Sequence, residues 1–403
     1  MQARTYERQC LRLLTLERGH STGQTLVFQV QAIEILKLIH MTPHASDRLQ
    51  AIALARQSWL HERDPSSAPV PAWLGRSWRR CLDMGLSPDQ TVGFDAVSTA
   101  QMRRVQEASQ PLVQAARPVL DELVRAMGNI GYFAILTDAH GVVVDVHGPV
   151  DHTDRRANII ARVGVDLSER AIGTSAISAA LAEEQPVWLH RGEHFFNDTS
   201  VYSCAGAPVF APNGQCAGML DLTGVDVVER PALKHLVRRS ARSIENRWLL
   251  EDPHNLVLRL NWPGNAPGDD SDGLLTLDQD GHVLGANPTA RQMLSLSAGA
   301  AGVHASDLFA MPWENLFDAA RHQQASIEVP LWSGLRLQTE ARTTAEMLTM
   351  NTGAPSSGKA LQDVTTELIR QAVTKAGGNV AEAARALGIS RATVYRKLGT
   401  PKH

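Results

Sequence analysis

The stretch GYFAILTDAHGVVVDVHG, residues 131–148, marks a change in the chain from helix-like to β-rich sequence. Helix-favouring sequence precedes it over 96–127. Within it, two short runs of aromatic and branched residues flank Asp138-Ala-His-Gly141, which has the composition of a tight turn. The stretch therefore predicts a hairpin that opens a mixed α+β domain, which we place at 125–228.

The sequence after the hairpin completes the pattern of this domain. GTSAISAALAEE, residues 173–184, has a capping Ser followed by good helix formers. GAPVF (206–210) and CAGMLDLTG (216–224) read as two more strands, joined by a turn at Pro212-Asn-Gly214. Helix and strand signals therefore alternate within one domain.

Composition and charge indicate a cytoplasmic, multidomain chain. With 403 residues, 43% of them hydrophobic and 20% charged, the chain is long enough for several globular cores. The net charge of −3 excludes a basic surface over the whole chain, so any nucleic-acid surface is local. The four cysteines lie far apart, without the close pairs of a zinc site, and the first 20 residues lack an export signal. We expect no membrane segment and no bound metal.

Periodicity and chain-breaking residues divide the rest of the chain. A heptad-like seam after Pro231 predicts a connecting or dimerising helix; its residues are Leu233, Val237, Ser240, Ile244 and Trp248. The Pro- and Gly-rich segment 261–273 marks a boundary before more strand-like sequence. The expected fold class is α+β multidomain, with these parts: an N-terminal helical region 1–124, an α+β domain 125–228, a connecting helix 229–260, a second α+β domain 272–343, a linker 344–360 and an all-α helix-turn-helix 361–403.

The C-terminal segment LIRQAVTKAGGNVAEAARALGISRATVYRKL, residues 368–398, has the spacing of a helix-turn-helix. Small Ala residues allow two helices to cross closely, and Gly388 supplies the turn. Eight basic and three acidic residues over 359–403 give this segment a charge of +5, which indicates double-stranded DNA as a partner. The candidate capping and DNA-contact residues are Asn379, Ser390, Arg391, Thr393, Tyr395, Arg396 and Lys397. A helical bundle with a solvated basic face, which binds no DNA, is the alternative.

These motifs resemble a known family of bacterial regulators. GGNVAEAARALGISRATVYRKL resembles the Fis-type helix-turn-helix that ends sigma-54-dependent enhancer-binding regulators. ERAIGTSAISAAL and YSCAGAPVFAPNGQCAGMLDLTG resemble the GAF sensor domain of the acetoin and dihydroxyacetone (glycerol metabolism) regulators in that family. DGLLTLDQDGHVLGANPTARQML is similar to the PAS domain of the dihydroxyacetone type. The resemblance implies a GAF-like domain at 125–228 and a PAS-like domain at 272–343.

The central AAA+ ATPase of that family is not recognisable between the PAS-like domain and the DNA-binding helices. The segment GAPSSGKA, residues 353–360, comes within one residue of the phosphate-binding pattern G-x-x-x-x-G-K-[ST], but Ala360 has no hydroxyl for Mg²⁺. No GAFTGA loop or acidic metal-binding strand accompanies it. We interpret the segment as a tether, and a nucleotide hydrolase is the rival interpretation.

The resemblance also implies a small-molecule site between the sheet and the helices of the GAF-like domain. The candidate ligand-binding residues are Thr174, Ser175, Trp188, His194, Phe195 and Cys204. A few polar groups in an apolar cavity suit a ketone, aldehyde or polyol. A metal or redox sensor built on His190, His194, Asp198 and Cys204 is the alternative, although Gly192 favours a loop there rather than a helix. No haem or flavin ligand is recognisable, so no cofactor is expected.

Together these features predict a one-component transcriptional regulator rather than an enzyme. We expect a homodimer that binds palindromic DNA, with an effector that shifts the helix after Pro231. The protein would control transcription by blocking a promoter or by contacting RNA polymerase, without ATP-driven sigma-54 activation. A sensor or interaction protein whose helix-turn-helix has lost DNA binding is a third possibility.

Overall fold

The computed structural model describes residues 45–62, 70–128, 130–299, 302–344, 380 and 384. The candidate DNA-contact residues and the segment GAPSSGKA lie outside the described residues. The chain divides into two compact units, and helix α9, Leu233–Glu251, continues from the first into the second. The first unit comprises Met1–Val209 and Cys216–Ile244, and the second Phe210–Gln215 and Glu245–His403.

The first unit contains a five-stranded sheet in the order β2-β1-β5-β4-β3, in which every described pairing is antiparallel. Its strands are β1 Tyr132–Asp138, β2 Val143–His147, β3 Val187–His190, β4 Tyr202–Phe210 and β5 Cys216–Val225. The hairpin expected within 131–148 is confirmed, since Ala134 of β1 pairs with His147 of β2. β1 is buried along its whole length, which indicates that both faces of the sheet are covered.

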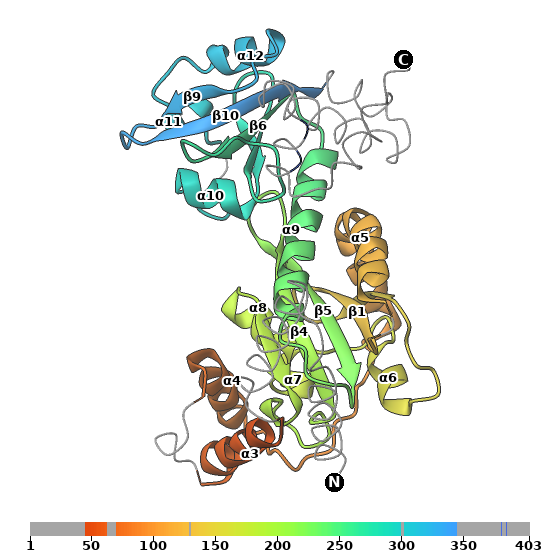
Figure 1. Ribbon diagram of the computed structural model, residues 1–403. Helices are drawn as coiled ribbons and strands as arrows, with labels where there is room; N and C mark the ends of the chain where they lie inside the picture. The colour runs from red at the N-terminus through yellow and green to blue at the C-terminus, as the bar shows by residue number, and fades with distance from the viewer. Residues whose placement is uncertain are drawn as a thin grey trace, which may run out of the picture. The chain divides into compact units, whose positions relative to one another are not determined.

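Helices lie against both faces of this sheet (Figure 1). Leu112 of the long helix α5 packs beside Gly218 on one face. Ile177 of α8 joins Ile135 and Met219 in a core on the other face. The helices are α3 Ala45–Arg56, the π-helix η1 Gln57–His61, α4 Ala72–Asp83, α5 Thr99–Met127, α6 Arg155–Ile160, α7 Glu169–Ile172, α8 Ala176–Glu183 and the 3₁₀ turn η2 Arg191–Glu193.

Helix α9 carries the heptad-like seam. Leu233, Val237 and Ile244 are buried within the single chain. Most of the seam is therefore buried within the described chain, whereas Trp248 is half-buried. The helix ends at Glu251, shortly before Pro253.

The second unit also contains a five-stranded sheet, in the order β8-β7-β6-β10-β9, with all described pairings antiparallel. Its strands are β6 Leu256–Asn261, β7 Gly273–Leu277, β8 Val283–Ala286, β9 Ile327–Pro330 and β10 Arg336–Thr343. Helices α10 Pro288–Leu294, α11 Ala305–Leu308 and α12 Glu314–Arg321 share one core with the sheet. The central strand β6 lies outside the expected range 272–343, because Leu256, Leu258 and Leu260 point into that core and Pro253 has already ended the helix.

Side chains form the β7–β8 turn and the cap of α10 in the second unit. Asp278 Oδ1 accepts hydrogen bonds from the backbone N–H groups of Asp280 and His282 at the β7–β8 turn. Asn287 Oδ1 accepts from the N–H of Ala290 at 2.8 Å and thereby caps α10. No helix in the described part of the chain combines the length and apolar composition needed to cross a bilayer.

Candidate functional site

A small cavity lies in the first unit between the sheet, the start of α8 and the loop that follows β3. Its volume is about 20 Å³, which is room for about one water molecule. The lining residues, all buried, are Phe94, Ile135, Ile160, Leu167, Ile172, Ser175, Ala176, Ile177, His194, Thr199, Tyr202, Cys204, Asp221 and Thr223. A molecule larger than water enters only if some of these side chains shift.

Two polar atoms of this lining have no hydrogen-bond partner among the described residues. They are Oδ1 of Asp221 and Nε2 of His194. Asp221 is 0% and His194 is 1% exposed. A buried polar atom without a partner is costly, and natural proteins usually pair such atoms with protein, water or ligand. Both atoms belong to residues that line the cavity, and each would gain a hydrogen bond from a polar ligand atom that reached it after a shift of the surrounding side chains.

Asp221 lies in the middle of the central strand β5, on the same face as Met219 and Thr223. The Thr223 hydroxyl donates to Asp221 Oδ2, and the Cys204 thiol lies 3.3 Å from Thr223 Oγ1. Since the Thr223 proton is used on Asp221, the Cys204 S–H donates to Thr223. Burial raises the pKa of Asp221 to about 7, only partly offset by the hydrogen bond from Thr223. The carboxyl group is therefore poised between its two protonation states near neutral pH.

His194 lies in the loop after β3, and its ring faces Tyr202 edge-on at 6.4 Å between centroids. Its Nδ1 lies 2.9 Å from the carbonyl oxygen of Arg191. A carbonyl only accepts, so Nδ1 carries the proton and Nε2 offers a lone pair. Burial lowers the pKa of His194 to about 4, and the nearby Arg56 charge acts in the same direction. At neutral pH the unpartnered Nε2 is therefore a hydrogen-bond acceptor.

The start of α8 is held by its own capping interactions. Ser175 Oγ accepts from the N–H of Ser178 at 3.1 Å, and Ser178 Oγ accepts from the N–H of Ser175 at 2.9 Å. This reciprocal capping box fixes the helix end that lines the cavity.

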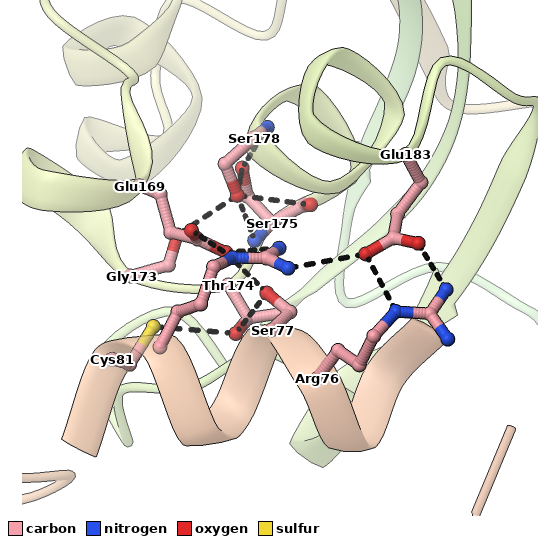
Figure 2. A network of polar contacts seen from close by, with 10 residues as sticks. Arg76, Ser77, Cys81, Glu169, Gly173, Thr174, Ser175, Ser178 and Glu183 are labelled. Atoms are coloured by element: carbon pink, nitrogen blue, oxygen red, sulfur yellow. Dashed lines mark hydrogen bonds and ion pairs between the residues drawn. The ribbon is translucent and has the colours of Figure 1, made fainter. Parts of the chain in front are cut away.

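A polar network joins helix α4 to α7 and α8 beside the cavity (Figure 2). Ser77 contacts Glu169 and, at 2.8 Å, the hydroxyl of Thr174. Arg80 pairs with Glu169 at 2.8 Å and with Glu183 at 3.1 Å. Helix α4 is thus fastened to the two helices beside the cavity.

The six residues expected to bind a ligand fall into two groups. Ser175, His194 and Cys204 line the cavity. Thr174 faces α4, where its hydroxyl contacts Ser77, and Phe195 packs edge-on against Phe196 at 5.1 Å between ring centroids.

Trp188 lies in a separate open groove lined by Arg48, Leu49, Trp188, His190, Arg191, Asp226, Val227, Val228, Glu229 and Pro231. Its ring stacks on His190, and its Nε1–H donates to Glu229 at 3.2 Å. Trp188 therefore has partners of its own outside the cavity.

Sequence reasoning did not single out Asp221. Its signal in the sequence is an acidic residue between Leu220 and Leu222 in a strand. Such a residue has no solvent-facing side when helices cover both faces of the sheet, so it must be buried.

The structure separates the four residues of the alternative metal site. His190 Nδ1 contacts Ser203 at 2.7 Å, and Asp198 Oδ2 accepts from the N–H of Val92 at 3.1 Å. The segment that contains them is a strand end, a 3₁₀ turn and a loop, so they share no helix face. In the described ranges no three His, Cys, Asp or Glu side chains are arranged to hold a metal ion.

Comparison with known proteins identifies two parts of the chain. Residues 360–399 match the family described as "Bacterial regulatory protein, Fis family", and residues 54–246 match the "MimR, N-terminal domain". The Fis-type helix-turn-helix expected at the C-terminus is thereby confirmed. The chain therefore combines a MimR-type N-terminal domain with a Fis-family helix-turn-helix.

Several of the similar curated proteins are regulators of transcription. The "Acetoin catabolism regulatory protein" of Cupriavidus necator is 32% identical over 256 residues, which is 62% of this chain and 38% of that protein. The acetoin dehydrogenase operon transcriptional activator AcoR of Bacillus subtilis is 27% identical over 37% of this chain and 25% of its own length. The propane 2-monooxygenase operon transcriptional activator MimR of Mycolicibacterium goodii is 27% identical over 42% of this chain and 28% of its own length. The chain thus spans well under half the length of each.

Among solved structures, the Escherichia coli DhaR(N)–DhaL complex contains a similar chain. The similarity covers 68% of this chain and 99% of that one, at 15% identity and a TM-score of 0.42. The resemblance to acetoin regulators is confirmed by the similar curated proteins.

Proposed function

We propose that the chain is a ligand-responsive, DNA-binding transcriptional regulator that senses a small molecule in the cavity of its first unit. One observation carries this proposal: the chain that contains a Fis-family helix-turn-helix also contains a cavity lined by His194 and Asp221, each of which has a buried polar atom without a described partner. The related transcriptional regulators support the same role. We assign the first unit as GAF-like and the second as PAS-like.

The proposed effector is a small, uncharged polar metabolite. His194 Nε2 accepts, so the effector must offer a donor such as a hydroxyl. No Lys or Arg lines the described cavity, and an anion would also meet the Asp221 carboxylate. Among ketones, aldehydes and polyols, those with a hydroxyl group therefore fit best.

The strand β5 connects the cavity with helix α9 along the chain. β5, which carries Asp221 and Thr223, ends at Val225, and α9 begins at Leu233. We propose that an effector which binds one arrangement of β5 better shifts α9 toward the matching arrangement. Two copies of the chain would place two recognition helices on a palindromic site.

We further propose that output does not require ATP. The segment 344–360 would connect the second unit directly to the Fis-family helices, and the regulator would act by promoter blocking or contact with RNA polymerase. An ATP-binding assay tests this proposal. Micromolar ATP affinity that is lost in Lys359→Ala would contradict it and favour the nucleotide-hydrolase interpretation.

The experiment that tests the function is DNA binding measured by fluorescence anisotropy on DNA upstream of the chain's own gene. We expect binding that weakens steeply with salt, and a loss of at least tenfold in Arg391→Ala and Arg396→Ala. Arg321→Ala is the matched control, because Arg321 is exposed in the second unit and its ion pair among the described residues is with Asp318. Absence of DNA binding both with and without effector would contradict this function and favour an interaction protein that does not bind DNA.

The effector itself is sought by thermal shift with small alcohols, aldehydes, ketones and acids. A compound that binds the cavity raises the melting temperature. The shift should disappear in His194→Gln and Asp221→Asn but persist in His282→Gln, whose side chain is exposed in the second unit. A shift that survives both cavity substitutions would place the effector elsewhere.

A further inference from the structure

We propose that Arg56, the last residue of α3, is a positioning residue that holds His194 at the cavity and makes the N-terminal helical region part of the effector site. This inference rests on the proposed function, because it takes the cavity as the place where the effector binds. Arg56 itself does not line the cavity. Its role is exerted through the loop that carries His194.

The guanidinium of Arg56 makes a concentrated set of contacts with this loop. It donates to the carbonyl oxygen of Gly192 at 2.9 Å, to that of His194, and to that of Phe195 at 3.0 Å. It also donates to Asn197 Oδ1 at 2.6 Å. Hydrogen bonds from a charged donor are the stronger kind, and the planar guanidinium fixes their directions. One side chain therefore ties together the loop backbone on both sides of His194, in addition to the bonds that the loop makes with Trp78 and Thr174.

Close packing shows that the loop and α3 are fitted to each other. A side chain at Gly192 would place its Cβ 2.9 Å from Arg56 Cδ and 3.0 Å from Ile52 Cγ2. The absence of a side chain at Gly192 lets α3 approach the loop backbone. Immediately after Arg56 the chain forms a π-helix, Gln57–His61, a rare geometry that occurs often at functional sites.

The consequence for the cavity follows from His194. Its Nε2 is held away from solvent because the loop backbone is fixed, and its own carbonyl is one of the acceptors of Arg56. Without Arg56, three loop carbonyls would lose their donor, and such groups recover hydrogen bonds most readily from water. The loop would then open, and His194 would no longer present a dry acceptor to the effector.

Arg80 is the matched comparison for Arg56. It is also partly buried and also fastens an N-terminal helix to the rest of the first unit, but it pairs with the carboxylates of Glu169 and Glu183. None of its described partners lies in the loop with His194. A role of Arg56 in general stability alone would make Arg56→Met and Arg80→Met equivalent.

The test is an NMR titration of histidine-labelled full-length chain, with the His194 signals assigned by His194→Gln. In the unaltered chain His194 should titrate with a pKa of about 4, so its ring is neutral near pH 7. We expect Arg56→Met to raise this pKa by at least 1 pH unit, toward the ordinary value of 6.5, because desolvation and the Arg56 charge are both reduced. Arg56→Lys should give a smaller rise, since lysine keeps the charge but not the fork of donors. Arg80→Met should leave the value unchanged.

An unchanged His194 pKa in Arg56→Met, or an equal rise in Arg80→Met, would overturn the proposal. If Arg56→Met does not fold, the His194 pKa is compared between Arg56→Lys and Arg80→Lys. A rise in Arg56→Lys alone supports the proposal, and an equal or absent rise overturns it. DNA binding by the unaltered chain is measured separately. Its absence would count against the proposed function while the histidine titration still decides the role of Arg56.

Discussion

At the scale of single residues, Asp221 is expected to make the stability of the first unit depend on pH. Its pKa is raised to about 7 by burial, so the folded chain keeps a proton that the unfolded chain releases above about pH 4. Stability is therefore lost as pH rises from about 4 to 7, by roughly 4 kcal/mol in total. Asp221→Asn removes this loss. The free energy of unfolding of the variant, relative to that of the unaltered chain, should therefore increase when the pH is raised from 5 to 8.

Urea unfolding of both proteins at the two pH values measures this difference, because all other titrating groups are shared. Asp318→Asn, an exposed carboxylate in the second unit, is the control and should show no such gain. A pH-independent difference between Asp221→Asn and the unaltered chain would mean that Asp221 is ionised in the fold.

Cys204 is expected to be unreactive despite its place at the cavity. Burial raises the pKa of its thiol well above the usual value, and the S–H is engaged with Thr223. Iodoacetamide at pH 8 should therefore modify Cys204 at least tenfold more slowly than the partly buried Cys216, as measured by mass spectrometry of the peptides. Denatured chain, in which both cysteines react alike, is the control. Rapid modification of Cys204 in the folded chain would support the redox-sensor alternative.

At the scale of secondary-structure elements, β6 is expected to be essential to the second unit. Leu258 is 0% exposed in the centre of its sheet. Leu258→Ala should therefore lower the free energy of unfolding by about 2–5 kcal/mol. Leu284→Ala, at a position 47% exposed on β8, should change it by less than about 0.5 kcal/mol. Thermal unfolding of both variants gives the comparison, and equal effects would mean that β6 is not a core strand.

The same element shows what the sequence can and cannot predict. The first hairpin was predictable because its turn residues and its two β-rich runs are adjacent in sequence. β6 is not predictable in the same way, because its partners β7 and β10 follow later in the chain and local pattern does not show which strand becomes central. The site was partly predictable for a similar reason. Ser175, His194 and Cys204 belong to recognisable motifs, whereas the importance of Asp221 and Arg56 depends on contacts across the fold.

At the scale of the whole molecule, the proposed regulator requires coupling between the cavity and the Fis-family helices. A compound that binds the cavity and changes DNA affinity by some factor must itself bind more tightly or more weakly to the DNA-bound chain by the same factor. We expect this factor to lie between about 5 and 150, the usual range for coupled sites. Isothermal calorimetry of the compound with and without saturating operator DNA measures this factor once, and anisotropy of the DNA with and without the compound measures it again.

Asp221→Asn should abolish the compound's effect on DNA binding, whereas His282→Gln should retain it. Equal affinities for the compound in the presence and absence of DNA would mean that the cavity does not control the DNA-binding helices.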